Sequence, residues 1–90
     1  MKTLKIFIIG NVQGVFFRKF IEDNAKKLNV RGYVRNLQDG KVEVIAEGRD
    51  ENVKKLLELC KQGSRQSEVK DVKFEEIKYQ GFDDFRISYL

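Results

Sequence analysis

The stretch from Gly10 to Arg18 has the residue types of an anion-binding loop. It joins an apolar run, residues 4–9, to an amphipathic segment. The start of a helix attracts anions through its open N–H groups and its dipole. Glycines at 10 and 14 allow successive N–H groups to point inward, and Arg18 can donate two hydrogen bonds to one oxyanion. These residues therefore predict a phosphate site that lacks the Gly-Lys-Ser/Thr of a Walker loop. From loop geometry alone, a glycine-containing turn with an ordinary surface arginine explains the stretch equally well.

The apolar positions predict the elements that hold this loop. Alternation predicts strands, and the spacing i, i+3, i+4 predicts helices. The predicted strands are residues 4–9, 30–35, 42–47, 72–79 and 85–87, and the predicted helices are residues 17–28 and 50–60. Asp50 is expected to cap the second helix, and Asp39-Gly40 predicts a tight hairpin. The apolar phase changes between Phe74 and Ile77, which indicates a bulge near Glu75–Glu76 or a strand buried on both faces.

The order β-α-β-β-α-β with a short fifth strand is the split βαβ, or ferredoxin-like, pattern of an α+β fold. It places both helices on one face of an antiparallel sheet, with the first and third strands central. The first and second strands then end on the same side, because a helix crosses between them. Asn36, at the end of the second strand, is therefore expected on the side of the loop. This architecture hosts metabolite sensors, RNA binders and enzymes, so it does not by itself define a function.

Two motifs resemble those of the acylphosphatase family. Residues 10–18, Gly-Asn-Val-Gln-Gly-Val-Phe-Phe-Arg, match its signature Gly-x-Val-Gln-Gly-Val-x-Phe-Arg at every fixed position. Residues 32–36, Gly-Tyr-Val-Arg-Asn, match its motif Gly-x-Val-Arg-Asn. The resemblance covers nearly the whole chain, so residues 1–90 are interpreted as a single acylphosphatase-like domain. Asn11 stands where many members have Arg or Lys, and Gly63-Ser64 replaces the frequent Gly-Pro. The second departure is expected to lie away from the motifs and to affect rigidity rather than chemistry.

The resemblance implies hydrolysis of the carboxyl–phosphate bond of small acyl phosphates to a carboxylate and inorganic phosphate. It implies catalytic roles for Arg18, which holds the phosphoryl group, and for Asn36, which orients the attacking water. The phosphate-binding loop that it implies consists of Val12, Gln13, Gly14, Val15, Phe16, Phe17 and Arg18. It implies no metal and no cofactor. Without the motifs, Asn36 would be interpreted as the cap of the following turn. Arg35 is in phase with Tyr33 and is expected to face solvent.

The composition is compatible with this chemistry and excludes several others. The 90 residues include no histidine and one cysteine, so there is no histidine base, no Cys–His nucleophile and no Cys/His zinc site. Acyl phosphate hydrolysis requires no general acid, because the conjugate acid of the departing carboxylate has a pKa of about 4.

The segment Cys60 to Arg65 resembles a thiol-phosphatase loop, but its arginine comes one residue early. Since Cys60 continues an apolar helical stripe, we expect a buried core residue.

The net charge of +4 keeps one alternative open, a non-catalytic basic ferredoxin-like module that binds nucleic acid or another polyanion. No concentrated basic stripe supports it, and the RNA-recognition signature fails after Arg31-Gly32-Tyr33. The expected partners are therefore a small-molecule acyl phosphate and inorganic phosphate, with no nucleic acid and no membrane. Residues 4–9 are too short for a signal-peptide core or a membrane span. A cytoplasmic monomer is expected.

Overall fold

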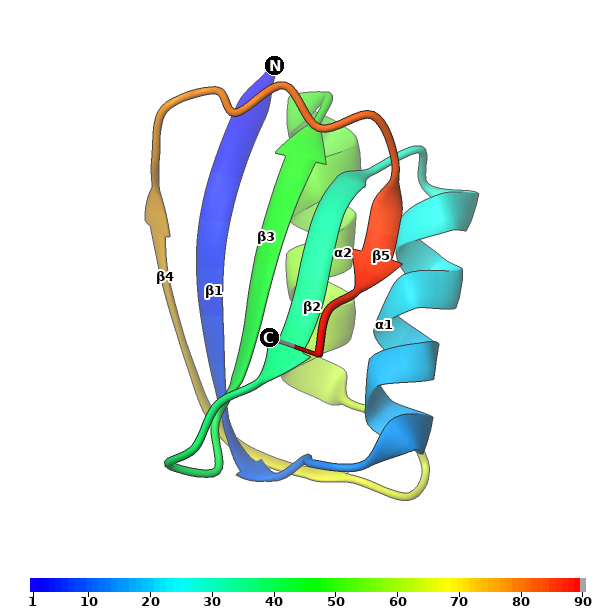
Figure 1. Ribbon diagram of the computed structural model, residues 1–90, viewed down its shortest axis with the longest axis vertical. Helices are drawn as coiled ribbons and strands as arrows, with labels where there is room; N and C mark the ends of the chain where they lie inside the picture. The colour runs from blue at the N-terminus through cyan, green and yellow to red at the C-terminus, as the bar shows by residue number, and fades with distance from the viewer. Residues whose placement is uncertain (90) are drawn as a thin grey trace.

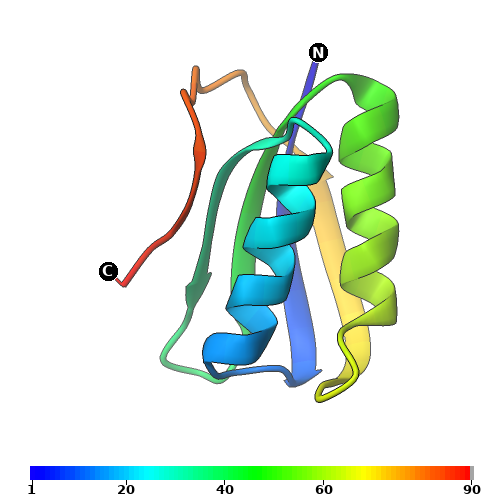
Figure 2. The ribbon, with the colours of Figure 1, turned by 90° about the vertical axis from the view of Figure 1, so that its right-hand side faces the viewer.

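The structure is a computed structural model that describes residues 1–89. Within this range the elements are β1 (Lys2–Asn11), α1 (Val15–Lys27), β2 (Arg31–Asn36), β3 (Val42–Gly48), α2 (Asp50–Gln62), β4 (Glu68–Glu76) and β5 (Phe85–Ile87). The strands form one sheet in the order β4-β1-β3-β2-β5 (Figure 1). Both helices cover the same face of this sheet (Figure 2). The predicted α+β ferredoxin-like arrangement is confirmed, with β1 and β3 adjacent inside the sheet.

The fifth strand makes the sheet mixed. β5 pairs with β2 in parallel, whereas the other neighbouring strands are antiparallel. The chain leaves β4 at one edge and crosses the end of the sheet before it descends as β5 at the opposite edge (Figure 1). This crossing gives β5 the direction of β2, so the segment after β5 runs toward the same end of the sheet as Asn36.

The hydrophobic core lies between the sheet and the two helices. Its strand residues include Leu4, Ile6, Ile8, Val34, Val42, Val44 and Ala46, and its helix residues include Phe17, Ile21, Ala25, Val53, Leu56, Leu57 and Cys60. The expectation that Cys60 is a core residue is confirmed. Burial raises the pKa of its thiol to about 12, so the thiol stays protonated at neutral pH and is a poor nucleophile.

Two boundary predictions for the helices are wrong. α1 begins at Val15 rather than at Phe17, because the side chains of Val15 and Phe16 are exposed and add nothing to the apolar period. α2 begins at Asp50 itself, Arg49 is the N-cap residue, and no side chain of the described residues caps this end. The Asp50 carboxylate instead lies 3.4 Å from the amino group of Met1.

The prediction of a bulge near Glu75–Glu76 is also wrong. β4 pairs regularly with β1 from Val72 to Glu76, and the register shifts between Ile9 and Gly10, which leaves one extra residue in β4. β4 is an edge strand and largely exposed, so it is not buried on both faces. The apolar phase changes because β4 ends at Glu76 and the next residues belong to the crossing segment.

A buried carboxylate attaches the crossing segment to the sheet. Glu47 on β3 is 1% exposed and accepts hydrogen bonds from the Thr3 hydroxyl and from the backbone N–H groups of Gln80, Gly81 and Phe82, at 2.6–2.9 Å. Burial alone would raise the pKa of this carboxyl, but the four hydrogen bonds favour the ionised form and hold its pKa below the ordinary value. Glu47 thereby positions the residues that lead into β5.

Candidate functional site

The register of the sheet brings the ends of β1 and β2 to one side. Ile8 of β1 and Asn36 of β2 both pair with Val42, which lies between them on β3. The loop that follows β1 therefore begins next to the strand end that carries Asn36. This agrees with the expectation that the first and second strands end together.

The Gln13 side chain attaches the loop to the β2–β3 hairpin. Its Nε2 atom donates hydrogen bonds to the carbonyl oxygens of Leu37, at 2.8 Å, and Lys41, at 3.3 Å. The hairpin is closed as predicted around Asp39 and Gly40: the backbone N–H of Lys41 donates to Asp39 Oδ1 at 3.0 Å, and Gly40 has a φ of 93°. The amide of Gln13 thus braces the loop against the hairpin.

The loop reaches α1 through a glycine in a conformation that other residues rarely adopt. Gly14 has a φ of 121° and is the N-cap residue of α1. Within residues 1–89 no side chain caps this end, and the first turn contains no acidic residue. The first N–H groups of α1 therefore have no side-chain acceptor and remain able to bind an anion.

Arg18 lies in the first turn of α1 and is only 9% exposed. Its Nε atom donates a long hydrogen bond, 3.4 Å, to the carbonyl oxygen of Gly14, which folds the guanidinium back over the loop. Within residues 1–89 no carboxylate forms an ion pair with it. A mostly buried cation without a counter-ion is costly, so an anion bound at this position recovers that free energy.

An aromatic ring that the sequence did not single out stacks on this arginine. The centroid of the Tyr89 ring lies 5.0 Å from the Arg18 guanidinium carbon, within the range of a cation–π contact. Tyr89 reaches Arg18 because the segment after β5 follows β2: the Ser88 N–H donates to the Val34 carbonyl oxygen at 2.8 Å. No local pattern predicts a contact that depends on the direction of β5.

Asn36 presents an unpaired amide oxygen. Its Oδ1 atom is buried and has no hydrogen-bond partner in the described part of the chain. The turn that follows is capped by Asp39 instead, so the interpretation of Asn36 as a turn cap is wrong. Leaving a buried acceptor unpaired costs about 1–3 kcal/mol, which a bound donor can recover.

Arg35 lies on the face of the sheet turned away from the core, as predicted, and its side chain is 34% exposed but paired. Its Nε atom donates to Glu43 Oε1 at 2.8 Å, and the Tyr33 hydroxyl donates to the same oxygen at the same distance. The hydrogen bond to Glu43 raises the pKa of Arg35, while burial and then the Glu43 hydrogen bond raise the pKa of Tyr33. These contacts join β2 to β3 immediately before Asn36 and leave Arg35 on the opposite face of the strand from Val34.

A second segment meets the loop from the other side. The turn at residues 64–67, between α2 and β4, borders a hollow of about 80 Å³ against the loop. The hollow is lined by Asn11, Val12, Gln13, Gly14, Phe16, Phe17, Ser64, Gln66 and Ser67. The expectation that Gly63-Ser64 lies away from the first motif is therefore wrong. The end of α2 and the start of α1 lie at the same end of the molecule, a result of helix packing that a sequence pattern does not encode (Figure 2).

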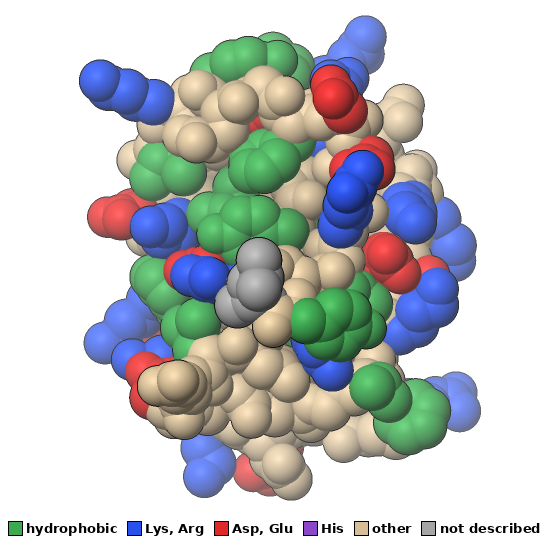
Figure 3. All heavy atoms as spheres, viewed as in Figure 1, with side chains coloured by type: hydrophobic (Ala, Val, Ile, Leu, Met, Phe, Trp, Pro, Cys, Tyr) green, Lys and Arg blue, Asp and Glu red, His purple; other side chains and the backbone are tan. Residues whose placement is uncertain are grey.

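The surface beside the start of α1 is apolar. Val15 and Phe16 are 59% and 70% exposed, although both are large hydrophobic residues. Figure 3 shows hydrophobic side chains at its lower right, over the first turn of α1. The loop at residues 12–18 thus borders a nonpolar surface as well as a cation.

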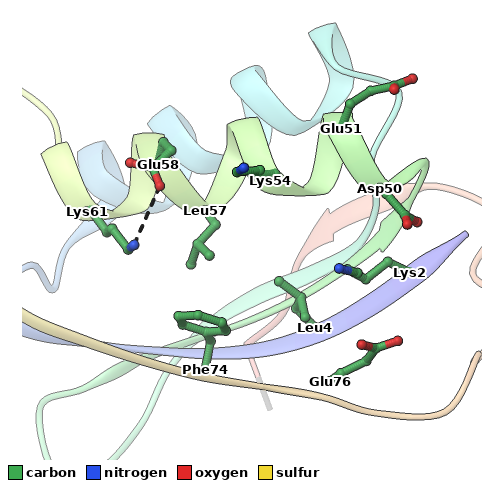
Figure 4. A pocket seen from close by; sticks show the side chains of 10 residues that line it. All are labelled: Lys2, Leu4, Asp50, Glu51, Lys54, Leu57, Glu58, Lys61, Phe74 and Glu76. Carbon is green, nitrogen blue, oxygen red and sulfur yellow. Dashed lines mark hydrogen bonds and ion pairs between the residues drawn. The ribbon is translucent and has the colours of Figure 1, made fainter.

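A groove with an apolar floor lies elsewhere on the molecule. It has a volume of about 600 Å³ between α2 and the strands β1 and β4, with Leu4, Leu57 and Phe74 at its base (Figure 4). Side chains of both charges surround it, and Lys61 lies 3.5 Å from Glu58. None of residues 12–18 lines this groove, so it does not contribute to the candidate site.

Two further features are absent from residues 1–89. No group of three or more His, Cys, Asp or Glu side chains is arranged to hold a metal ion. No helix in that range has the length and apolarity to cross a membrane.

Comparison with known proteins identifies the family. A sequence model of the acylphosphatase family matches residues 4–87. The acylphosphatase of Bacillus licheniformis is 47% identical over 90 residues, 99% of this chain and 100% of that protein. The acylphosphatase of Methanocella arvoryzae is 44% identical over 97% of this chain and 99% of that protein. The crystal structure of acylphosphatase from Bacillus subtilis superimposes with a TM-score of 0.94 at 38% identity, and covers 99% of this chain and 100% of that one. The chain therefore belongs to the acylphosphatase family of hydrolases.

Proposed function

We propose that this chain hydrolyses the carboxyl–phosphate bond of small acyl phosphates with Arg18 and Asn36 as its catalytic residues. An acyl phosphate dianion and one water give a carboxylate and a dihydrogen phosphate anion, so charge and atoms balance. The observation that carries the proposal is the position of two groups at one end of the sheet: the Arg18 guanidinium, which has no counter-ion in residues 1–89, and Asn36 Oδ1, which has no hydrogen-bond partner there.

Arg18 and the loop backbone bind the phosphoryl group. The guanidinium lacks a counter-ion in residues 1–89, and the uncapped N–H groups at the start of α1 add donors with fixed directions. These groups compensate charge on the phosphoryl oxygens as the bond to the leaving group lengthens. Since Gln13 holds the loop against the hairpin, little reorganisation is needed on binding.

Asn36 orients the attacking water. Its amide oxygen accepts a hydrogen bond from the water, whose oxygen then attacks phosphorus. The electron pair of the breaking P–O bond leaves with the carboxylate, and the water proton ends on the phosphate product. The loose transition state needs no strong base, so an amide that positions the water is sufficient.

The same chemistry sets the substrate class. A carboxylate departs without protonation, whereas the alkoxide of a phosphate monoester needs a general acid that this site lacks. Stable phosphate monoesters are therefore poor substrates. The proposed reaction uses no metal and no cofactor, and the substrate and inorganic phosphate are its small-molecule partners.

The test is release of benzoate and phosphate from benzoyl phosphate in the presence of EDTA. Wild type should turn over, and Arg18→Ala should lose at least about a hundredfold in kcat/KM. Arg49→Ala is the matched control, because Arg49 is exposed and lies at the start of α2, away from the loop. Turnover at the buffer rate by folded wild type would overturn the proposal, and the loop would then be an anion-binding site without catalysis.

A further inference from the structure

Nonpolar side chains gather around Arg18 although they are exposed to solvent. Six large hydrophobic residues of the described chain are exposed, and three of them, Val15, Phe16 and Tyr89, lie in the first turn of α1 or against its Arg18 side chain. A cluster of exposed nonpolar side chains is typical of a binding surface. Its position beside an arginine without a counter-ion indicates an occupant that has both an anionic and a nonpolar part.

Two of these side chains are neighbours of the Arg18 guanidinium. The Tyr89 ring lies over it at 5.0 Å. Val15 precedes Arg18 by three residues on α1, so their side chains share one face of the helix. The hydrogen bond from Arg18 Nε to the Gly14 carbonyl oxygen directs the guanidinium toward this first turn. A ligand whose phosphoryl group binds Arg18 therefore has Val15 and Tyr89 beside its remaining atoms.

A groove along β5 includes the same tyrosine. The groove has a volume of about 630 Å³, and its lining includes Phe82, Ile87, Ser88 and Tyr89. Tyr89 thus belongs both to this groove and to the surroundings of Arg18. Pockets that bind small molecules have volumes of about 300–1,000 Å³, so the groove has room for an aromatic ring or a short alkyl chain.

The charged residues of this groove do not favour an acidic acyl group. Among the described residues, Arg86 is the only basic one in the lining, and its Nε atom donates to both carboxylate oxygens of Asp84, at 3.1 and 3.0 Å. Asp83 also lines the groove and would repel a second carboxylate. Next to Tyr89 the lining contains Ile87, a nonpolar residue. This end of the groove therefore suits a nonpolar group.

From these observations, and resting on the function proposed above, we infer that Val15, Tyr89 and the adjoining end of the groove bind the acyl substituent of the substrate. The Tyr89 ring packs against the substituent, and Val15 contacts it from the first turn of α1. The substrate class is thereby narrowed to acyl phosphates with nonpolar acyl groups, with aromatic groups favoured by the ring.

The experiment compares benzoyl phosphate with acetyl phosphate, each kcat/KM being divided by the uncatalysed rate of that substrate. The ratio of the two values is the acyl selectivity, from which effects on phosphoryl binding cancel. Tyr89→Ala should lower this selectivity about three- to tenfold, whereas Tyr89→Phe keeps the ring and should retain it. Val15→Thr keeps the shape but replaces a methyl group by a hydroxyl, and should lower the selectivity about two- to threefold.

Phe74→Ala is the matched control, because it removes a half-exposed ring from the groove beside α2. Its acyl selectivity should equal that of wild type. Val15 and Tyr89 are 59% and 78% exposed, so their substitution removes little core packing.

Binding of two phosphonates gives a readout that does not depend on turnover. Benzoylphosphonate and acetylphosphonate keep the acyl group on phosphorus through a bond that the proposed reaction does not break. Calorimetry should show that wild type binds benzoylphosphonate at least about threefold more tightly than acetylphosphonate, and that Tyr89→Ala loses this preference.

The two readouts separate the possible failures. Wild-type turnover with the same acyl selectivity in wild type, Tyr89→Ala and Val15→Thr would overturn the acyl subsite and leave the proposed function standing. Absence of wild-type turnover, with the preference for benzoylphosphonate present, would overturn the proposed function alone. Absence of both turnover and preference would overturn both.

Discussion

The ring of Tyr89 lies over the guanidinium of Arg18, with 5.0 Å between the ring centroid and the guanidinium carbon. Tyr89 itself is 78% exposed, so the contact is maintained by the chain that carries it rather than by burial of the ring. That chain is attached through the Ser88 N–H to β2, the strand that ends at Asn36. One strand thus helps to position both proposed catalytic side chains.

We expect Tyr89→Leu to weaken phosphate binding about two- to fivefold, because a cation–π contact at an exposed site contributes about 0.5–1 kcal/mol. Tyr89→Phe keeps the ring and should bind phosphate like wild type. Phosphate binding by both variants is measured as the inhibition constant of inorganic phosphate. Equal weakening in the two variants would assign the effect to the hydroxyl and contradict a role for the ring.

The amide of Gln13 is expected to be a brace of the loop. Gln13→Glu keeps the shape but cannot donate to the carbonyl oxygens of Leu37 and Lys41. We expect a loss of about 1–3 kcal/mol in the free energy of unfolding, together with weaker phosphate binding. Gln38→Glu places the same charge on the exposed hairpin nearby and is the matched control. Chemical denaturation of both variants makes the comparison, and equal losses in the two would rule out a bracing role.

Glu47 gives the fold a defined response to acid. The pKa of Glu47 is lower in the folded state than in the unfolded state, where it is near 4.5. The ionised carboxylate therefore stabilises the fold fully above pH 4.5. This stabilisation is lost as the pH falls through the folded-state pKa. Glu47→Gln should lower the free energy of unfolding by about 2–3 kcal/mol at pH 7, since four hydrogen bonds to a carboxylate are weakened. The difference in the free energy of unfolding between Glu47→Gln and wild type should shrink below pH 4.5. Chemical denaturation of both proteins at several pH values measures this difference.

The exposed residue Glu51 provides the control for this result. Glu51→Gln should change the free energy of unfolding by less than about 0.5 kcal/mol at every pH. A Glu47→Gln effect that stayed constant down to pH 3 would show that the carboxylate charge is not what holds residues 80–82.

If the water attacks phosphorus, the oxygen atom of that water becomes part of the phosphate product. Hydrolysis of benzoyl phosphate in ¹⁸O-enriched water should place the label in phosphate and leave the benzoate unlabelled. Mass spectrometry of the two products measures the distribution. Label in the benzoate would mean attack at the carbonyl carbon and would contradict the roles proposed for Arg18 and Asn36.

The fold was largely predictable because its signals are local. Alternation of Leu4, Ile6 and Ile8 predicts β1, and the Asp39-Gly40 pair predicts the hairpin. The limits of α1 were missed because the exposed side chains of its first turn break the apolar period. The phase change after Phe74 was assigned to a bulge, whereas the strand simply ends two residues later.

The candidate site was predictable only in its loop and in Asn36. Contacts between distant segments were not, because they depend on packing. The turn of Ser64 meets the loop since both helices place an end there, and Tyr89 reaches Arg18 since β5 runs parallel to β2. The pairing of Arg35 with Glu43 depends on the register of β2 against β3.

The most direct test of the account concerns Asn36. Steady-state hydrolysis of benzoyl phosphate by Asn36→Ala should show kcat reduced at least about a hundredfold, with the inhibition constant of phosphate within about threefold of wild type. Asn52→Ala, on α2, is the matched control and should match wild type in both quantities. A kcat within about threefold of wild type in folded Asn36→Ala would contradict the assignment of Asn36 as the residue that orients the attacking water.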